Sequence, residues 1–521
     1  MDKPKFVVLI ILDGWGVAPP SHGNAITQAK TPFFSNLISL YPTFTLQAAG
    51  LAVGLSWGEQ GSSEVGHLNL GSGRVIYQSL PRIDKAIEEG SFFTNPAFLK
   101  VINHVKKNNS KLHLLGLVSN GNVHSSFNHL KALLQLSKKE NLKKVYLHAI
   151  LDGRDTPRDS GLIFIEEILK EIKKNNLGGI ATISGRFYAM DRDNHWERIE
   201  KAYRAMVEGD SEKKFSHPLE AIRDSYQQKI FDEEFVPTVI VKDNQPLAKI
   251  EDNDGAIFFN FRTERARELT KAIVLPDFKG FSRPKKIQNL IFVTMTEYEE
   301  GLPVEVAFPP QTIETPLAKI LSERGLRQLH IAETEKYAHA TYFFNGGREK
   351  PFPNEDWVLV PSPRVPSFDQ KPEMSAKEIT QKVIAAIEKE KYDFILVNFA
   401  NPDMVGHTGN LQAIIIAIET LDKLLSQIVE ATLRKDGVVL ITADHGNAEE
   451  VINLQTGAID KEHSTNPVPF ILVGKGWEKK EKEEIDLSLL PPAGVLADVA
   501  PTILKLMGIP QPKEMDGQPL I

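Results

Sequence analysis

Short apolar runs that end in carboxylate or imidazole side chains are the feature that most constrains the fold of this chain. The run Val438 to Ile441 leads directly into Thr442-Ala443-Asp444-His445-Gly446-Asn447. The run Phe394 to Phe399 is followed by Ala400-Asn401-Pro402-Asp403-Met404-Val405-Gly406-His407. Such runs are typical of buried strands, and α/β proteins place functional side chains at the carboxyl ends of parallel strands. The sequence therefore predicts an α/β fold with chemistry at two strand ends.

Two further metal-competent side chains lie far from these in the sequence. Asp13 follows the run Phe6 to Leu12, and His463 lies in a polar loop before Pro469 to Val473. A single aspartate after a strand is commonly a turn residue or a helix N-cap. Several carboxylates crowded together repel one another, and a divalent cation relieves that repulsion. The sequence thus predicts a two-metal site with the candidate ligands Asp13, Asp403, His407, Asp444, His445 and His463.

Composition narrows the classes of protein and ligand. Carboxylate and imidazole ligands suit Mn²⁺, Zn²⁺ or Mg²⁺ and do not discriminate among them. The 521 residues include no cysteine, which excludes disulfides, a thiol nucleophile and zinc-thiolate sites. With 61 basic and 68 acidic residues the net charge is −7, which argues against nucleic acid as the main partner. Phe6 to Leu12 is too short for a membrane span or signal-peptide core, so we expect a cytoplasmic protein without a membrane partner.

A second series of strand-like runs leads into arginine or histidine. These runs are Leu112 to Val118, Val145 to Leu151, Gly179 to Ile183 and Ala256 to Phe261. Helical patterns such as His129 to Lys139 and Ile163 to Lys174 lie between them. The segment is therefore predicted to form repeated β-loop-α units around a second parallel sheet.

Five arginines follow the ends of these runs, namely Arg154, Arg186, Arg192, Arg262 and Arg265. One arginine at a strand end commonly forms a surface salt bridge. Several in one crevice favour a bound anion, because a guanidinium group makes paired hydrogen bonds to carboxylate or phosphate oxygens. We expect a small phosphorylated acid as the substrate. Asp155, beside Arg154, either accepts hydrogen bonds from substrate hydroxyls or caps a helix, and both interpretations stay open.

The positions of the candidate ligands predict the domain organisation. Asp13 lies near one end of the chain and the other metal candidates lie beyond residue 400, so both ends build the metal domain. We predict a discontinuous metal domain of residues 1–77 and 312–521, with residues 78–311 as an inserted arginine-bearing domain. Glycine and proline interrupt the periodicity of apolar residues near both boundaries of the inserted domain. In Gly61-Ser62-Ser63-Glu64, either serine could be a helix N-cap, where a hydroxyl meets the positive end of the helix dipole.

Seven segments, in order along the chain, resemble the cofactor-independent phosphoglycerate mutases. They are Leu12-Asp13-Gly14-Trp15-Gly16, Ser63-Glu64-Val65-Gly66-His67-Leu68-Asn69, Leu151-Asp152-Gly153-Arg154-Asp155, Gly185-Arg186-Phe187-Tyr188-Ala189-Met190-Asp191-Arg192, Asn260-Phe261-Arg262, Ala332-Glu333-Thr334-Glu335-Lys336-Tyr337-Ala338-His339 and Thr442-Ala443-Asp444-His445-Gly446-Asn447. The resemblance implies an alkaline-phosphatase-like metal domain with an inserted α/β phosphotransferase domain. It also implies interconversion of 3-phosphoglycerate and 2-phosphoglycerate in glycolysis and gluconeogenesis, through a phosphoserine intermediate and without 2,3-bisphosphoglycerate.

The resemblance also implies roles for individual residues. Asp403, His407 and His463 would bind one divalent metal ion. Ser63 would be the nucleophile and would bind the second ion together with Asp13, Asp444 and His445. The substrate-binding residues would be His124, Arg154, Asp155, Arg186, Arg192, Arg262, Arg265 and Lys336. We expect Mn²⁺ ahead of Mg²⁺, Co²⁺ or Zn²⁺, a small-molecule substrate as the partner, and a monomer.

Two positions depart from the family pattern. Ser62 stands where asparagine is usual, which leaves open whether Ser62 can replace Ser63, and His195 stands where arginine is common. Two other functions are kept as alternatives. The first is a metal-dependent phosphatase or another phosphomutase of the same superfamily. The second is a non-catalytic binding protein in which the metals only stabilise the fold.

Overall fold

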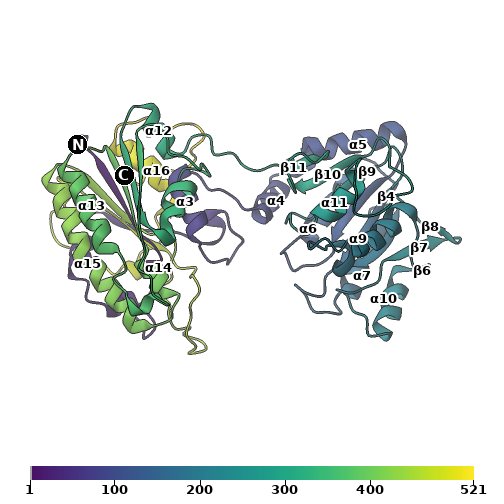
Figure 1. Ribbon diagram of the computed structural model, residues 1–521, viewed down its shortest axis with the longest axis horizontal. Helices are drawn as coiled ribbons and strands as arrows, with labels where there is room; N and C mark the ends of the chain where they lie inside the picture. Colours follow the sequence, from purple (N-terminus) through teal and green to yellow (C-terminus); the bar gives the residue numbers. More distant parts are fainter. Residues whose placement is uncertain (1–2) are drawn as a thin grey trace. The chain divides into compact units, whose positions relative to one another are not determined.

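The computed structural model describes residues 3–521 and divides into two compact units. Unit 1 combines both ends of the chain, Met1–Gln78 and Gln311–Ile521, and unit 2 is Ser79–Pro310. Each unit contains one main sheet with helices packed against it (Figure 1). The predicted α/β class with two domains is confirmed.

A largely parallel sheet forms the centre of unit 1. Among residues 3–521 it has eight strands, in the order β13-β12-β14-β1-β15-β16-β2-β17. The strands are β1 (Val7–Leu12), β2 (Thr43–Gln47), β12 (Gln328–Glu333), β13 (Glu355–Val360), β14 (Phe394–Phe399), β15 (Val438–Thr442), β16 (Val468–Val473) and β17 (Gly494–Val495). β1 lies between β14 and β15 and is parallel to both, whereas β16 is antiparallel to β15 and β2. The carboxyl ends of β14, β1 and β15 therefore meet at one edge of the sheet.

Helices cover both faces of this sheet, which explains why its central strands are continuous apolar runs. Every residue of β1, β14 and β15 is buried. Figure 1 shows α13 and α15 on one side of the sheet and α3, α12 and α16 on the other. The helices of unit 1 are α1 (Ala25–Gln28), α2 (Pro32–Leu40), α3 (Ser63–Ser72), α12 (Leu317–Glu323), α13 (Ala376–Glu388), α14 (Asn401–Gly406), α15 (Leu411–Arg434) and α16 (Val499–Leu506). No helix within residues 3–521 has the length and apolar character needed to cross a membrane.

Unit 2 is built around its own sheet, in the order β11-β10-β9-β3-β4-β5-β7-β6, with β8 paired to β7. The strands are β3 (Leu112–Leu117), β4 (Val145–Leu151), β5 (Gly179–Gly185), β6 (Lys213–Phe215), β7 (Thr238–Lys242), β8 (Gln245–Pro246), β9 (Gly255–Phe258), β10 (Ile291–Thr296) and β11 (Glu305–Phe308). The helices are α4 (Ser79–Glu88), α5 (Pro96–Asn108), α6 (Phe127–Lys139), α7 (Gly161–Lys174), α8 (Arg186–Ala189), α9 (Trp196–Tyr203), α10 (Pro218–Gln227) and α11 (Arg267–Val274).

Alternating side chains of β3 supply two separate cores on the two faces of this sheet. Leu112 and Leu114 pack with side chains of α5, α6 and α7, whereas Leu115 and Leu117 pack with side chains of α9 and α11. Because successive strand residues point to opposite faces, one strand can fill both cores. β3, β4 and β5 are parallel neighbours, so their carboxyl ends also lie together.

One strand ends earlier than the sequence suggested. β9 stops at Phe258, although the apolar run continues to Phe261. The backbone N–H of Phe261 donates to the carbonyl of His124 at 2.8 Å, so the end of the run pairs with a loop instead of a strand. This pairing attaches the loop that carries His124 to the segment that carries Arg262.

Candidate active site

Three neighbouring strand ends place the carboxylates of the candidate metal site. Asp13 directly follows β1, Asp444 follows β15 by one residue, and Asp403 lies in α14, just after β14. Gly14 has φ +77°, and a Cβ atom there would lie 2.8 Å from the Cα of Asp403. Only glycine combines this backbone conformation with such a close approach, so Gly14 allows the Asp13 turn to pack against α14.

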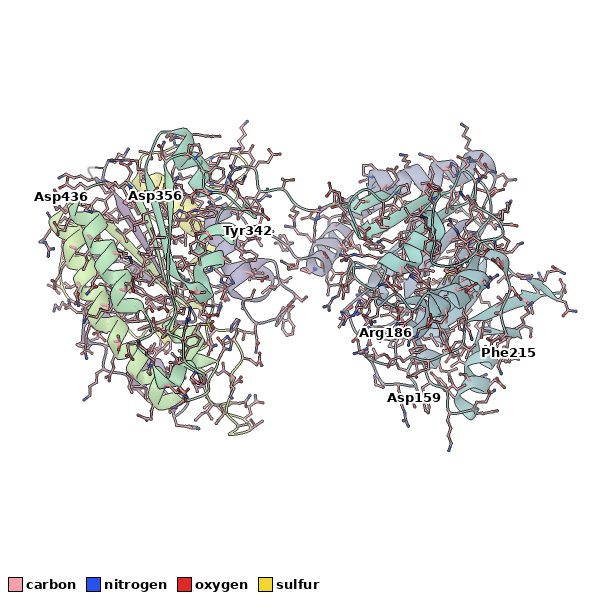
Figure 2. The ribbon with its side chains drawn as sticks, in the orientation of Figure 1. Asp159, Arg186, Phe215, Tyr342, Asp356 and Asp436 are labelled. Carbon is pink, nitrogen blue, oxygen red and sulfur yellow. The ribbon has the colours of Figure 1, made fainter. Side chains whose placement is uncertain are left out.

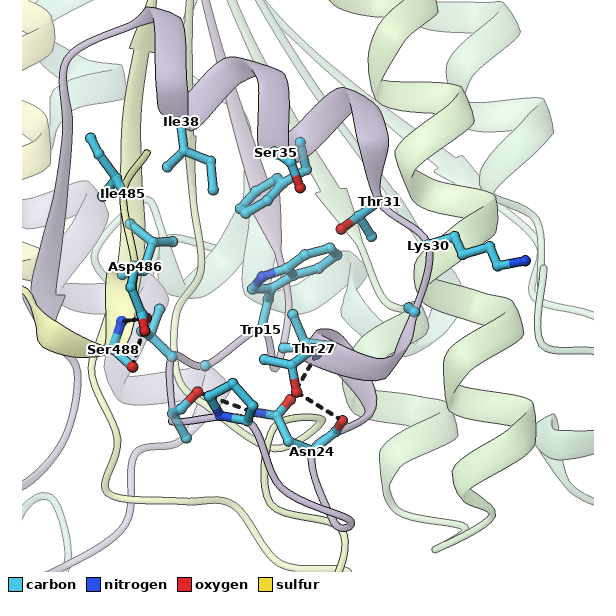
Figure 3. Close-up of a pocket in the computed structure, with 18 of the residues that line it drawn as sticks. Trp15, Asn24, Thr27, Lys30, Thr31, Ser35, Ile38, Ile485, Asp486 and Ser488 are labelled. Carbon is cyan, nitrogen blue, oxygen red and sulfur yellow. Dashed lines mark hydrogen bonds between the residues drawn. The ribbon is translucent and has the colours of Figure 1, made fainter. Parts of the chain in front are cut away.

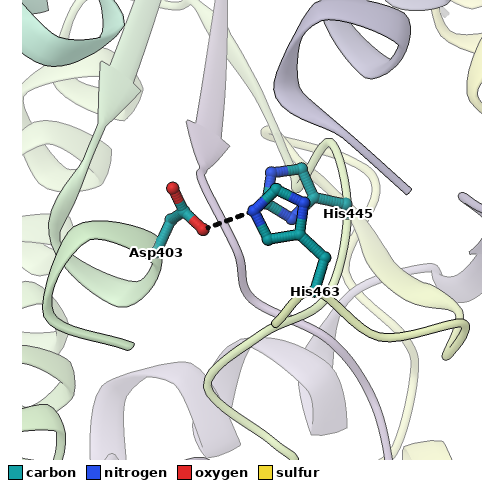
Figure 4. Close-up of side chains that lie close together, drawn as sticks. All are labelled: Asp403, His445 and His463. Atoms are coloured by element: carbon teal, nitrogen blue, oxygen red, sulfur yellow. Dashed lines mark ion pairs between the residues drawn. The ribbon is translucent and has the colours of Figure 1, made fainter. Parts of the chain in front are cut away.

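Asp403, His407 and His463 form the first group of candidate ligands. Oδ1 of Asp403 lies 3.2 Å from Nε2 of His407 and 3.2 Å from Nε2 of His463. The two Nε2 atoms are 3.1 Å apart. Figure 4 shows His463 against Asp403, with the ring of His445 stacked on that of His463 at a centroid distance of 3.8 Å. Nδ1 of His407 lies against the backbone carbonyl of Lys461, and Nδ1 of His463 lies against that of Gly61. The Nε2 atom of each of these two rings therefore faces the group of candidate ligands.

Ser63 lies at the centre of the second group. Its Oγ is 2.9 Å from Nε2 of His445 and 3.3 Å from Oδ1 of Asp13. Nε2 of His445 lies 3.5 Å from Oδ2 of Asp444. The structure therefore brings Asp13, Ser63, Asp444 and His445 together around one point.

The two adjacent serines have different environments. Ser62 is the N-cap of α3, and its hydroxyl accepts a hydrogen bond from the N–H of Val65 at 3.4 Å. Ser63 is the first residue of the helix, and its side chain is buried among the candidate ligands. Capping thus occupies Ser62 and leaves the Ser63 hydroxyl facing the carboxylates and imidazoles.

Lys336 joins both groups. Its Nζ lies 2.7 Å from Oδ1 of Asp13, 2.6 Å from Oδ2 of Asp403 and 2.7 Å from Oγ of Ser63. The side chain is 4% exposed and follows β12 in a short 3-10 helix, Thr334–Lys336. A buried ammonium group in contact with two carboxylates provides the positive charge that these anions require.

The pKa values of these groups reflect their mutual charges. Burial by itself lowers the pKa of Lys336, but Asp13, Asp403 and Asp444 outweigh it and raise the value above that of a free lysine. Burial and the charge of Asp444 raise the pKa of Asp13. Burial opposes ionisation of Asp403 too, yet Lys336 and the two histidines hold its pKa well below the usual value. The site is therefore a dense, mutually compensating set of charges.

In unit 2, Arg186 anchors the candidate substrate-binding residues (Figure 2). Its NH1 lies 2.6 Å from Oδ1 of Asp152 and 2.6 Å from Oδ2 of Asp155, and the side chain is buried. Nε2 of His124 is 3.9 Å from the same Oδ2 of Asp155. Burial, followed by the charge of Arg186, lowers the pKa of His124 to about 4, so the imidazole is neutral at ordinary pH.

The other predicted arginines gather around this anchor. Burial lowers the pKa of Arg265, and so do the nearby charges of Arg192, Arg186 and Arg154. NH1 of Arg265 donates to the carbonyl of Met190, which precedes the Asp191-Arg192 pair. Arg154 and Arg262 are largely exposed, at 57% and 52% of their side chains. The cluster thus offers exposed guanidinium groups beside buried ones, as binding of an anion requires.

The comparisons with known proteins agree along the whole chain. Residues 83–300 match a model described as the BPG-independent PGAM N-terminus, and residues 316–483 match one described as type I phosphodiesterase / nucleotide pyrophosphatase. The chain is 52% identical over 518 residues to the 2,3-bisphosphoglycerate-independent phosphoglycerate mutase of Clostridium perfringens, covering 99% of each. The chain belongs to this family of mutases.

Two further relatives have the same character. The 2,3-bisphosphoglycerate-independent phosphoglycerate mutase of Chloroflexus aggregans is 50% identical over 543 residues, covering 100% of this chain and 99% of the relative. A crystal structure of the Leishmania mexicana phosphoglycerate mutase at low cobalt concentration is 32% identical and has a TM-score of 0.52. It covers 99% of this chain and 98% of that one. The resemblance drawn from the motifs is confirmed.

The donors of this mutase's site fit divalent metal ions. Asp13, Asp403 and Asp444 are all buried, and Oδ2 of Asp444 has no hydrogen-bond donor among residues 3–521. A buried carboxylate oxygen without a donor is costly unless a cation neutralises it. Oxygen and imidazole donors without sulfur suit Mn²⁺, Co²⁺, Zn²⁺ and Mg²⁺.

Two residues that support the candidate site residues, one in each unit, were not predicted from the sequence. Asp152 accepts hydrogen bonds from Ser119 and Arg186 and holds the turn that follows β4. Glu449 accepts hydrogen bonds from the N–H groups of Gly16 and Asn447, so it joins the loops after β1 and β15. Asp152 follows a strand just as the predicted ligands do, and that position could have identified it. Glu449 had no comparable signal in the sequence.

A separate cavity of about 710 Å³ lies in unit 1 beside Trp15 (Figure 3). Its walls include Phe34, Ile38 and Leu487, and the rings of Trp15 and Phe34 are 4.8 Å apart. None of the described residues that line it is a candidate metal ligand. The cavity is therefore distinct from the candidate active site, although Trp15 lies only two residues after Asp13.

Proposed function

We propose that this mutase interconverts 3-phosphoglycerate and 2-phosphoglycerate through a phosphoserine at Ser63, without 2,3-bisphosphoglycerate. The observation that carries the proposal is the position of the Ser63 hydroxyl, within 2.7 to 3.3 Å of Lys336, His445 and Asp13. A buried hydroxyl in contact with a lysine, an imidazole and a carboxylate is placed for nucleophilic chemistry. The reaction is an intramolecular phosphoryl transfer, which makes the enzyme an isomerase.

Two divalent metal ions complete the proposed site. One is held by Asp403, His407 and His463, and the other by Asp13, Ser63, Asp444 and His445. When bound, such ions lower the pKa of a coordinated hydroxyl and neutralise negative charge on the transferring phosphoryl group. We expect Mn²⁺ ahead of Co²⁺, Mg²⁺ and Zn²⁺.

Lys336 stabilises the charge of the attacking group in this scheme. Its raised pKa keeps Nζ protonated, so the ammonium donates a hydrogen bond to Oγ of Ser63 and later to phosphoryl oxygens. The bond from phosphorus to the substrate oxygen breaks as the bond to Ser63 forms. The freed glycerate oxygen takes up the proton that Ser63 loses. The reverse transfer to the other hydroxyl then regenerates Ser63.

The arginine cluster binds the acid during this sequence. Arg262 and Arg154 are exposed enough to form paired hydrogen bonds with a carboxylate, while Arg186 is held in place by Asp152 and Asp155. Retention of glycerate is what separates a mutase from a phosphatase, because a lost glycerate would leave the phosphoserine to hydrolysis. This cluster favours the mutase over the phosphatase alternative. A role in glycolysis and gluconeogenesis, a cytoplasmic location and a monomeric state belong to the same proposal.

The proposed nucleophile can be tested by mapping the phosphorylated residue. Protein mixed briefly with 3-phosphoglycerate and Mn²⁺ is quenched in acid, digested and sequenced by mass spectrometry. Phosphate on Ser63, and its loss in Ser63→Ala but not in Ser62→Ala, is the expected result. Phosphate on Ser62 would contradict the assignment.

A further inference from the structure

A buried imidazole and a buried amide contact the candidate ligands of the second metal ion without being among those ligands. His67 is one helical turn after Ser63 in α3, and Asn398 is the penultimate residue of β14. Both side chains are fully buried. Neither residue is among the metal, substrate or nucleophile positions proposed above, yet each contacts one of them.

Asn398 links Asp13 to His67. Its Nδ2 donates to Oδ2 of Asp13 at 2.8 Å and lies 3.0 Å from Nε2 of His67. The carboxylate oxygen can only accept, which sets the orientation of the amide group. Because the amide nitrogen also donates to Nε2, the ring hydrogen of His67 is carried by Nδ1.

The Nδ1–H group of His67 points toward the other half of the site. It donates to the backbone carbonyl of Ser63 at 2.9 Å, and Oδ2 of Asp444 lies 3.2 Å from the same nitrogen. This oxygen is the one that has no hydrogen-bond donor among residues 3–521. The chain of contacts therefore runs from Asp13 through Asn398 and His67 to Ser63 and Asp444.

We propose that His67 and Asn398 are positioning residues that align Asp13, Ser63 and Asp444 for the second metal ion. The inference rests on the proposed function, because it takes the ligand assignment from there. Hydrogen bonds behind the ligands of a metal fix the ligand orientation, and their loss typically lowers metal affinity by about 10- to 100-fold. Asn398 holds Oδ2 of Asp13, so that Oδ1 faces Ser63 and Lys336. Nδ1 of His67 and Nε2 of His445 both lie near Oδ2 of Asp444, at 3.2 and 3.5 Å.

His330 provides a matched control elsewhere in unit 1. It is also a fully buried histidine, with Nδ1 at 2.9 Å from the carbonyl of Ala340 and 3.3 Å from Oε1 of Glu355. These contacts reproduce those of His67 Nδ1, but Glu355 is not a proposed ligand. A general effect of removing a buried histidine should therefore be the same at both positions.

The test compares Mn²⁺ binding by calorimetry in full-length parent, His67→Leu, Asn398→Leu and His330→Leu, all shown to be folded without metal by circular dichroism. In both His67→Leu and Asn398→Leu, we expect one of two Mn²⁺ ions to bind about 10- to 100-fold more weakly. The second ion should bind as in the parent, and His330→Leu should bind both normally. The double variant His67→Leu/Asn398→Leu should lose little more than either single variant, because both belong to one network.

A milder substitution keeps the test decisive if His67→Leu does not fold. His67→Asn retains an N–H near the position of Nδ1 and should recover part of the lost affinity. Two Mn²⁺ ions bound with parental affinity in folded Asn398→Leu would overturn the inference whether or not His67→Leu folds, as would equal losses in His330→Leu. Mn²⁺ binding by the parent tests the proposed function separately. A parent that binds no Mn²⁺ would contradict that proposal before any variant is compared.

Discussion

Replacing Lys336 by methionine should destabilise the protein most when metal is absent. The substitution keeps a long unbranched side chain and removes the ammonium group that contacts Asp13 and Asp403 at 2.7 and 2.6 Å. Loss of one partner from a buried ion pair costs about 3–5 kcal/mol, because the remaining charge is left uncompensated. At about 2 °C per kcal/mol for a domain as large as unit 1, the melting temperature should fall by about 6–10 °C.

Bound metal should reduce this loss. Divalent ions at the proposed sites supply positive charge to the same carboxylates, so Lys336→Met should lose clearly less stability in Mn²⁺ than in EDTA. The assay is differential scanning fluorimetry of parent and variant in both conditions, checked by calorimetry. A fall of the same size in Mn²⁺ and in EDTA would refute the idea that metals and Lys336 neutralise the same groups.

An exposed lysine serves as the control for this prediction. Lys391 lies 2.6 Å from Oδ2 of Asp356, the same distance that separates Lys336 from Asp403, but its side chain is 52% exposed. Solvent screens such a pair, so Lys391→Met should leave the melting temperature nearly unchanged in either condition. The contrast isolates burial, since the contact distance is equal.

Three other substitutions test the proposed nucleophile, the arginine cluster and Glu333, the last residue of β12. Ser63→Ala should abolish mutase turnover in a coupled enolase assay while the protein still melts cooperatively, and substantial residual turnover would count against the covalent scheme. Arg262→Met should raise KM for 3-phosphoglycerate about 10-fold or more without lowering the melting temperature, because a charged hydrogen bond contributes about 1.5–3 kcal/mol. An unchanged KM would remove Arg262 from the substrate site. Burial raises the pKa of Glu333 to about 7 in the folded protein. Between about pH 4.5 and pH 7 this carboxyl group is therefore ionised in the unfolded chain but protonated in the folded one, so the parent should lose stability as pH rises over that range. Glu333→Gln keeps an acceptor for the N–H of Ser375 but cannot ionise. The melting temperature of Glu333→Gln minus that of the parent should therefore increase as pH rises over that range. The same difference in melting temperature at pH 5 and at pH 8 would contradict the assignment.

The strands that carry the site could be predicted from the sequence, because burial on both faces makes them continuous apolar runs. The predicted run Phe394 to Phe399 has the observed bounds of β14, and the runs before Asp13 and Asp444 each differ by one residue from the observed strands. The end of β9 could not be predicted in this way. The N–H of Phe259 still donates to Leu115 of β3, and whether Phe261 then pairs with a strand or with the loop of His124 depends on tertiary contacts that periodicity does not encode.

The candidate ligands could be selected because their residue types and strand-end positions coincide, although their metal-binding roles stay proposals. The residues behind them could not be selected in the same way. Asn398 lies inside an apolar strand and Glu449 inside a loop, and nothing local distinguishes them from ordinary polar residues. Their contacts with Asp13 and Gly16 span more than 380 positions of the chain, so only the folded structure identifies them.

The most direct test of the proposed function is product analysis by phosphorus NMR. Purified protein is given 3-phosphoglycerate without 2,3-bisphosphoglycerate, in one sample with Mn²⁺ and in a matched sample treated with EDTA. We predict 2-phosphoglycerate in the Mn²⁺ sample and none in the EDTA sample. Inorganic phosphate in place of 2-phosphoglycerate would show a phosphatase, and equal turnover in both samples would contradict the two-metal mechanism.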